Sequence, residues 1–270
     1  MYNHVLVGIH VTVLGSGSAG NCTLIETEAT AILVDAGLSS RQIVERLRLI
    51  DRNLDQVDAI LLTHEHSDHT GALDVLNKQR PFPVYANRLT AEAVLNNPQC
   101  NGLKRISWRL FSTGSPFEIG DFTIESFSVP HDAQDPVGFT IHHGELSVGV
   151  LTDLGHVTKL ALERVRSVSA LVLEANHDVK LLQEDTARPW ATKQRIMGRH
   201  GHLSNDTAAT LAGEIAGDRL RHIFLAHLSR DCNRPDLAHQ VVSHTLRQAG
   251  ATHVSVAVSS QQKPTNTFSL

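Results

Sequence analysis

One short segment of the chain carries the groups of a metal site. Residues 63–69 read Thr-His-Glu-His-Ser-Asp-His, an H-x-H-x-D-H pattern that follows an apolar run. Alternate side chains of an extended segment point to the same side, so His64 and His66 can bind one metal ion. Asp68 and His69, just past the turn, can reach a second ion. Imidazole and carboxylate without thiolate suit Zn(II), Mn(II) or iron. The alternative, a polar loop of solvated histidines, fits so specific a spacing poorly.

Histidine is also unusually abundant in this chain. There are 17 His in 270 residues, against 2 Met, 2 Trp and 2 Tyr. Histidine is the commonest metal ligand and its imidazole titrates near neutral pH, so the count agrees with metal chemistry. The count alone does not select the ligands, because spacing and neighbouring residues must do so. His177 and His200 lie close to the motifs described below, and we assign them no role.

Short β-type runs alternate with helical stretches. Periodicity and turn residues predict strands at 10–14, 23–26, 31–35, 58–63, 105–111, 122–127, 137–142, 146–151, 222–226 and 253–258. They predict helices at 39–49, capped by Ser39 or Ser40, and at 160–165, 204–215 and 236–248. No repeat, low-complexity stretch or Gly/Ser linker divides the chain. We therefore expect residues 1–270 to form a single β-rich α/β domain of packed layers.

A glycine motif near the start suggests a different chemistry. Gly15–Gly20 matches G-x-G-x-x-G after a strand, and Asp35 follows where a dinucleotide-binding fold places its ribose-binding acid. Such a fold needs a helix directly after the glycines, with the pyrophosphate at its N-terminus. The residues before the strand at 31–35 are too few for that helix and its return loop. A hairpin that turns near Ala29 and Thr30 fits better, so a nicotinamide-dependent oxidoreductase is the weaker interpretation.

With these residues in view, the chain resembles the metallo-β-lactamase superfamily, whose signature is H-x-H-x-D-H at a strand end. The resemblance covers almost the whole chain and implies a four-layer αβ/βα sandwich, two β-sheets flanked by helices. It also implies three later ligands, His131, Asp153 and His227, each after an apolar run. By this resemblance the first site would take His64, His66 and His131, and the second Asp68, His69 and His227, with Asp153 bridging them.

The same resemblance implies the cofactors and the chemistry. Two divalent ions, Zn or Mn, about 4 Å apart would hold a bridging hydroxide for in-line attack and neutralise charge on the attacked group. Asp35 matches the strand-end carboxylate that orients a ligand histidine, and its alternative role is that of a turn residue. The superfamily includes lactam, thioester and lactone hydrolases as well as nucleases, so the metal site does not choose the substrate.

A later motif favours phosphodiesters. Residues 201–205 read Gly-His-Leu-Ser-Asn, similar to the segment of phosphodiesterase branches such as tRNase Z and PhnP-like enzymes. By that resemblance, His202 would give a proton or positive charge to the developing oxyanion. Glu174 would hold it protonated, since a neighbouring carboxylate raises the pKa of a histidine. Ser204 and Asn205 also fit a helix N-cap, which can itself bind phosphate.

Several segments together resemble the YycJ/WalJ exonuclease branch of the superfamily, namely residues 16–22, 128–133, 174–178, 201–205 and 226–229. This resemblance implies a nuclease, a 5′-exonuclease on DNA, whose loop 15–21 lies beside the substrate and holds a phosphate on exposed amides. The interval between His69 and His131 leaves no room for the large inserted domain of RNase J-type enzymes. The expected substrate contacts are Ser16, Ser18, Asn21, Ser204 and Asn205.

The stretch 188–200 is basic and contains one tryptophan, Trp190. Its cations could follow a phosphate backbone while the indole stacks on a base. The alternative is a solvated helix face. The cations are Arg188, Lys193, Arg195 and Arg199.

Composition limits where the protein acts. With 24 Lys+Arg and 28 Asp+Glu the net charge is -4, which excludes coating nucleic acid with the whole surface but leaves room for a local basic groove. Cys22, Cys100 and Cys232 show no C-x-x-C spacing and fit neither a disulfide framework nor a cysteine zinc site. The start of the chain lacks a signal-peptide pattern, and no apolar run reaches the roughly 18 residues of a membrane span. We expect a cytoplasmic protein with no membrane partner and leave its oligomeric state open.

These observations predict a dinuclear metal-dependent phosphodiesterase, a nuclease of DNA rather than RNA. Asp68, His202 and Glu174 are its expected catalytic residues. One alternative is a small-molecule hydrolase of the same fold that acts on a cyclic phosphodiester, a thioester or a lactone. Another is a non-enzymatic binding or signalling-associated protein that keeps the metal, and the intact ligand set argues against it.

Overall fold

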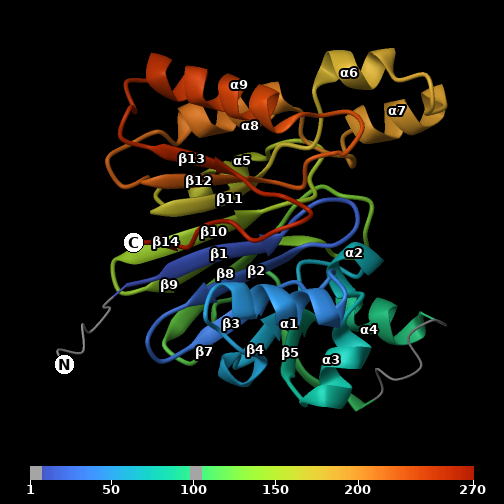
Figure 1. Ribbon diagram of the computed structural model, residues 1–270, viewed down its shortest axis with the longest axis vertical. Coiled ribbons are helices and arrows are strands. Elements are labelled where there is room, and N and C mark those ends of the chain that lie inside the picture. Colours follow the sequence, from blue (N-terminus) through green and yellow to red (C-terminus); the bar gives the residue numbers. More distant parts are fainter. Residues whose placement is uncertain (1–7, 98–104) are drawn as a thin grey trace.

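Two β-sheets stacked face to face form the centre of the molecule, and helices cover their outer faces (Figure 1). The structure is a computed structural model that describes residues 8–97 and 105–270. Cys100, considered above as a possible thiol ligand, lies outside the described residues. The predicted arrangement of two sheets flanked by helices is confirmed.

The first sheet contains strands from the N-terminal half and from the end of the chain. In spatial order it holds β14 (Phe268–Ser269), β1 (His10–Gly15), β2 (Cys22–Glu26), β3 (Ala31–Val34), β4 (Ala59–Leu61), β5 (Pro83–Asn87) and β6 (Ser107–Phe111). Strands β14 to β3 pair antiparallel, and β3 to β6 pair parallel. Parallel neighbours end at the same edge of a sheet, which brings the residues after β3 and β4 together.

The second sheet repeats this division into an antiparallel and a parallel part. Its order is β13 (Ser255–Val258), β12 (His222–Ala226), β11 (Ala170–Glu174), β10 (Leu146–Leu151), β9 (Val137–His143), β8 (Phe122–Ser128) and β7 (Phe117–Ile119). Strands β7 to β10 pair antiparallel, and β10 to β13 pair parallel. The residues after β10, β11 and β12 therefore also share one edge.

The helices lie in two outer layers and one projection (Figure 1). On the side of the first sheet are α1 (Ser40–Leu49), α2 (Ser67–Thr70), α3 (Leu73–Gln79) and α4 (Arg88–Asn96), with a short 3₁₀ turn at Leu54–Gln56. On the side of the second sheet are α5 (Lys159–Val165), α8 (Asn205–Glu214) and α9 (Pro235–Gln248). At one end of that layer project α6 (Val179–Glu184) and α7 (Trp190–Met197).

Strand β3 shows how the sequence builds these layers. Ile32 and Val34 belong to the cluster between the sheets, whereas Ala31 and Leu33 pack in the cluster that faces the helices of the first sheet. Successive side chains of a strand point to opposite faces, so a run that is apolar throughout can bury both. The second sheet does the same, and its outer cluster packs against α5, α8 and α9. The sandwich thus has rigid sheets whose ends can carry polar side chains.

The glycine motif belongs to a hairpin and not to a dinucleotide fold. Gly15–Gly20 leads from β1 into β2, which pairs antiparallel with β1, and the predicted turn near Ala29 and Thr30 joins β2 to β3. The predicted caps are confirmed, with Ser39 capping α1 and Ser204 capping α8. Among the described residues, no helix has both the length and the apolar character that crossing a bilayer requires.

The predicted elements omit α2, β7 and β14, because two to four residues carry too little periodicity to detect. They also omit the longer α3, α4, β5, α6 and α7, of five to nine residues. The strand predicted at 58–63 ends earlier, at Leu61, and the one predicted at 31–35 ends at Val34. In both cases the chain leaves the sheet where the first polar site residues begin.

Candidate metal centre and active site

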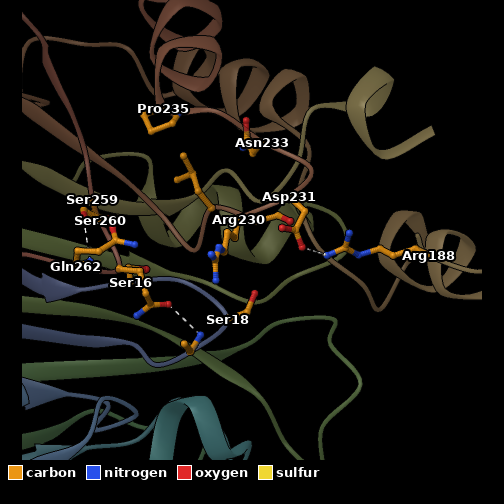
Figure 2. Close-up of a pocket in the computed structure, with 14 residues that line it drawn as sticks. Ser16, Ser18, Arg188, Arg230, Asp231, Asn233, Pro235, Ser259, Ser260 and Gln262 are labelled. Carbon is orange, nitrogen blue, oxygen red and sulfur yellow. Dashed lines mark hydrogen bonds and ion pairs between the residues drawn. The ribbon is translucent and has the colours of Figure 1, made fainter. Parts of the chain in front are cut away.

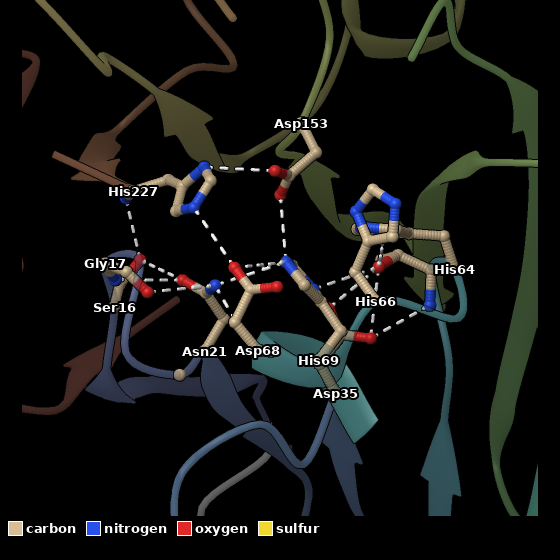
Figure 3. A network of polar contacts seen from close by, with 12 residues as sticks. Ser16, Gly17, Asn21, Asp35, His64, His66, Asp68, His69, Asp153 and His227 are labelled. Carbon is tan, nitrogen blue, oxygen red and sulfur yellow. Dashed lines mark hydrogen bonds and ion pairs between the residues drawn. The ribbon is translucent and has the colours of Figure 1, made fainter. Parts of the chain in front are cut away.

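Polar side chains from both sheets meet at the common edge of the sandwich. Asp35 follows β3, Asp153 follows β10, and His227 comes directly after β12. His64 follows β4, and Glu174 is the last residue of β11. Figure 3 shows Asp153 between His227 and His69, with Asp35 and His64 beside them. Residues separated by almost two hundred positions therefore share one site because parallel strands of two sheets end together.

Three of these residues leave their strands through left-handed backbone turns. Asp35 has φ 60°, Asp153 φ 56° and His227 φ 56°, three of the four positive-φ residues other than glycine in the described chain. Such a conformation costs a non-glycine residue on the order of 1–3 kcal/mol and persists only where surrounding contacts hold it. At His227 one such contact is its backbone N–H, which donates to Ser16 Oγ at 2.7 Å. The left-handed turn at each strand end directs the side chain toward the shared site.

Helix α2 is pressed against the loop after β3, which positions Asp68 and His69. A Cβ atom on Gly37 would lie only 1.6 Å from the carbonyl oxygen of Asp68, so glycine is required at this close approach. The Ala36 N–H donates to the His69 carbonyl, and the Asn21 N–H to the Asp68 carbonyl, both at 2.8 Å. The backbone of α2 is thus held from two loops of the first sheet.

The structure brings every predicted metal ligand together. Ligand atoms within each of two predicted groups lie within 4.8 Å of one another: His64, His66 and His131, and Asp68, His69 and His227. Asp153 contacts both groups. Its Oδ2 is 3.1 Å from His69 Nε2, and its Oδ1 is 3.8 Å from His131 Nε2. The position of Asp153 therefore matches that expected of a bridging carboxylate.

Four buried histidines share one orientation, with Nδ1 beside a protein oxygen. The pairs are His64 with Thr63 at 3.0 Å, His69 with Asp35 at 2.7 Å, His131 with the Gly201 carbonyl at 3.1 Å, and His227 with Glu174 at 2.8 Å. Fixing one ring nitrogen in this way orients the other as a ligand. Nε2 of His64, Nε2 of His227 and Oδ2 of Asp153 are buried without a hydrogen-bond partner. A divalent cation would satisfy these atoms, so the donor set fits divalent metal ions.

The pKa values of two buried imidazoles, His64 and His69, shift in opposite directions. Burial, and then the neighbouring His69, hold the pKa of His64 well below its usual range, which leaves its ring neutral and able to bind a metal. Burial also disfavours charge on His69, but Asp35 and Asp153 outweigh it and raise the pKa of His69 well above its usual range. The acidic groups of the site therefore attract positive charge strongly, whether it comes from protons or from metal ions.

Glu174 holds His202 at the edge of this cluster. The carboxylate is completely buried, and its Oε1 lies 2.8 Å from Nδ1 of both His202 and His227. Its Oε2 accepts from the backbone N–H groups of Leu154 and Leu203 at 3.1 and 3.0 Å. Burial opposes ionisation of Glu174, but the charge and hydrogen bond of His202 lower its pKa to about 2. With both oxygens satisfied, this carboxylate binds two imidazoles.

His202 differs from the four buried histidines in its exposure. Its side chain is 21% exposed, and its Nδ1 lies 3.6 Å from Asp153 Oδ1. Burial lowers the pKa of His202, but the charge of Glu174 and their hydrogen bond raise it above the usual value. The ring is thus a partly accessible group next to the candidate ligands whose protonated form Glu174 favours, as suits an acid for a substrate oxygen.

Most of the expected substrate contacts have internal partners. Ser16 and Asn21 are buried, and Ser16 Oγ donates to Asn21 Oδ1 at 2.7 Å. Asn205 is buried as well, and Ser204 accepts from the Thr207 N–H as the cap of α8. Ser18 is exposed at the tip of its loop. A substrate contact through these side chains stays a prediction. In the structure, their hydrogen bonds within the protein hold the loops around the site in shape.

The basic stretch 188–200 is only partly a solvated face. Lys193 is buried and donates to the Gln183 carbonyl at 2.7 Å, and Arg195 pairs with Asp132 at 2.8 Å. Trp190 is 59% exposed at the start of α7. Residues of α7 line a small pocket together with His202, so this helix stands directly beside the site.

The two unassigned histidines lie outside the ligand groups of the described chain. His177 is buried, and burial lowers its pKa to about 4, so it is a neutral ring within the fold. His200 is exposed. No role was predicted for Asn233 from the sequence, yet it exchanges two side-chain hydrogen bonds of 2.9 Å with Asn205 and joins the loop after β12 to α8. Its proximity to the 226–229 motif was the available signal.

A comparison with protein families identifies this arrangement. A family model described as "Beta-lactamase superfamily domain" matches residues 30–227. The chain belongs to the beta-lactamase superfamily. That membership confirms the predicted resemblance and the sandwich fold, and with the relatives below it makes the chain a metal-dependent hydrolase.

Two curated relatives match this chain over nearly their whole length. The chain is 37% identical over 244 residues to "Exodeoxyribonuclease YycJ" of Bacillus anthracis, covering 90% of this chain and 91% of that one. It is 37% identical over 243 residues to "Exodeoxyribonuclease WalJ" of Streptococcus pneumoniae strain D39, covering 90% of each. A crystal structure of the metallo-beta-lactamase fold protein YhfI from Bacillus subtilis superposes with a TM-score of 0.70 at 17% identity, over 97% of this chain and all of that one. The last likeness shows the fold alone.

Proposed function

We propose that the protein is a dinuclear metal-dependent phosphodiesterase that degrades DNA as a 5′-exonuclease. The observation that carries this proposal is the buried Glu174, which holds His202 beside the candidate metal ligands and favours its protonated form. A histidine bound in this way can protonate an alkoxide leaving group, the difficult departure in phosphodiester cleavage. The exodeoxyribonuclease names of the two relatives support DNA as the substrate.

The residues that would hold the metals are those that the structure gathers. In this proposal His64, His66 and His131 bind one ion, Asp68, His69 and His227 bind the other, and Asp153 contacts both. The bound ions, Zn or Mn, would supply Lewis acidity at the phosphate and lower the pKa of a water molecule. The neutral ring of His64 and the orphaned Nε2 of His227 support this assignment.

Two partly exposed side chains, Asp68 and His202, take the proton-transfer roles, and the buried Glu174 and Asp35 support them. Asp68 is 24% exposed, unlike the buried Asp153, and can hold an incoming water by a hydrogen bond and accept its proton. His202 transfers its proton to the departing oxygen. Before that transfer, the carboxylate of Glu174 balances the positive charge of the protonated imidazole. Asp35 keeps His69 oriented through the contact at Nδ1. Asp35 and Glu174 stand at strand ends, Asp68 lies on the short helix α2, and His202 lies on the loop before α8.

We also propose that residues 1–270 act as one domain in the cytoplasm. β14, close to the C-terminal end, pairs with β1 and completes the first sheet, so both ends of the described chain contribute to the sandwich. Cys22 and Cys232 are free thiols, as a reducing compartment allows.

A substrate panel tests the function directly. The metal-loaded protein would be given bis-p-nitrophenyl phosphate, a thioester, nitrocefin, and DNA and RNA of one sequence labelled at either end. We expect turnover of the phosphodiesters, with mononucleotides released first from the 5′ end of DNA. Turnover of the thioester but of neither phosphodiester would overturn the proposal, and faster cleavage of RNA would reassign the substrate.

A further inference from the structure

A pocket of about 420 Å³ adjoins the candidate metal centre. Its walls come from four segments that are distant in the sequence: the loop with Ser16 and Ser18, Arg188, the loop from Leu228 onward, and residues 259–262. Figure 2 shows these residues around the opening, with Arg230 in the middle of the group. The volume is near the lower end of the roughly 300–1,000 Å³ of small-ligand sites, so it suits a single nucleotide better than a strand.

The pocket and the metal centre share their structural supports. Ser16 lines the pocket, and its Oγ accepts the backbone N–H of the candidate ligand His227 at 2.7 Å. Arg230 stands three residues after His227 on the same loop. A group in the pocket would therefore lie next to a phosphate held at the candidate metal centre.

The C-terminal segment closes one side of the pocket. Gln261 Oε1 accepts from the Ala19 N–H, and Gln261 Nε2 donates to the Gly20 carbonyl, both at 2.9 Å. These two bonds tie residues 259–262 to the loop between β1 and β2. A nucleic-acid strand that enters the pocket meets this closure, so only its end can be accommodated.

The charges of the pocket suit a phosphate. Arg230 is exposed, and no ion pair or hydrogen bond of its guanidinium occurs within the described part of the chain. Arg188, on the same rim, is engaged by Asp231 at 2.8 Å and by Asp185. A free guanidinium presents two parallel N–H groups that match phosphate oxygens. Leu228 and Pro235 add apolar surface for a sugar and a base.

We propose that this pocket binds the terminal nucleotide of the DNA strand, with its phosphate on Arg230. This inference rests on the proposed function and deepens it, because a pocket closed behind one nucleotide makes cleavage start at a strand end. Arg230 is thus a specificity residue that selects ends over internal sites. Asp231 limits the affinity, since its carboxylate lies near the bound phosphate and pairs with Arg188.

Two variants that should change the affinity in opposite directions test the pocket, with deoxyadenosine 5′-monophosphate and deoxyadenosine as probes. In the metal-loaded protein, Arg230→Gln should weaken binding of the monophosphate by roughly ten- to a hundredfold and that of the nucleoside little. Asp231→Asn should tighten the monophosphate by up to about fivefold. Arg109→Gln is the matched control, because Arg109 is also exposed but lies on β6, in the other sheet.

Activity measurements separate this inference from the proposed function. Arg230→Gln should lower kcat/KM for end-labelled DNA by at least tenfold and leave hydrolysis of bis-p-nitrophenyl phosphate unchanged, since that diester does not fill the pocket. Equal losses on both substrates, or unchanged affinity for the monophosphate, would overturn the pocket assignment. If the wild-type protein cleaves no phosphodiester, the proposed function fails, and the binding comparison still decides whether the pocket takes a nucleotide.

Discussion

Nδ1 of His202 lies 2.8 Å from Oε1 of Glu174, a carboxylate with no exposed surface. An ionised carboxylate only accepts hydrogen bonds, so the imidazole is the donor and keeps its Nδ1 proton. The charge of Glu174 raises the pKa of His202, while the two backbone N–H groups at its second oxygen keep the carboxylate from turning away. This relationship fixes one tautomer and one ring orientation at the edge of the candidate metal centre.

The first prediction concerns His202→Ala. We expect the variant to keep its metal, because His202 is outside both predicted ligand groups, and to lose about 10²- to 10⁴-fold in kcat on phosphodiesters, the usual contribution of a general acid. Metal content by mass spectrometry and steady-state rates would be measured together. His200→Ala, a change of an exposed neighbour, is the control and should match the wild type. Loss of metal from His202→Ala would show that His202 is a ligand and not an acid.

The second prediction concerns Asp153→Asn. Asp153 contacts His69 and His131, one from each ligand group, so neutralising it should release metal and lower turnover by more than the roughly 100-fold typical of outer contacts. Competition with a chromogenic chelator would measure the affinity. Asp206→Asn, a change of an exposed residue in the first turn of α8, should change neither quantity. Near-native activity of a metal-loaded Asp153→Asn protein would contradict the bridging assignment.

The third prediction concerns Gly37→Ala. The added methyl group would overlap the Asp68 carbonyl, so α2 must move, and overpacking of this kind costs about 1–3 kcal/mol. We expect a lower Tm, and weaker metal binding because Asp68 and His69 shift together. Gly217→Ala serves as the control, since its Cβ would approach only the Ile215 carbonyl, at an ordinary 3.8 Å. A variant with normal Tm and metal affinity would show that the loop after β3 does not position α2.

The fourth prediction concerns pH and a residue away from the site. His222 is buried, its ring stacks on Phe268 with centroids 4.2 Å apart, and burial lowers its pKa from 6.5 to about 4. Above pH 6.5 neither the folded nor the unfolded state binds this proton, and the stability is fully present. As the pH falls from 6.5 to 4 the unfolded state alone is protonated, which removes at most about 3 kcal/mol.

Urea unfolding at pH 7 and pH 4.5 would measure this loss. His222→Gln should lose less stability than the wild type between these two values, because the residue that titrates only in the unfolded state is gone. His244→Gln, a change of an exposed histidine on α9, should lose as much as the wild type. An identical loss in His222→Gln and wild type would contradict the assigned burial effect.

From local pattern alone, the sequence identified the chemical groups, because metal ligation demands particular residue types at short spacings. The motif 63–69 named four candidate ligands, and apolar runs before His131, Asp153 and His227 marked strand ends. The resemblance then supplied the two-sheet sandwich, which the family comparison confirms. Elements of two to four residues, such as α2, escaped prediction because their stability comes from tertiary contacts and not from propensity.

Relations across the sandwich required the folded chain. The resemblance predicts that Glu174 holds His202, but it does not predict that the same carboxylate also contacts His227. No local pattern reveals that Gly37 touches α2 or that Arg230 lines a pocket that Gln261 closes on one side. Such pairings depend on which strand ends meet. The packing of the whole core, which buries both faces of each sheet, determines which ends these are. The sequence therefore indicated which atoms could do the chemistry, and long-range packing placed them within reach of one another.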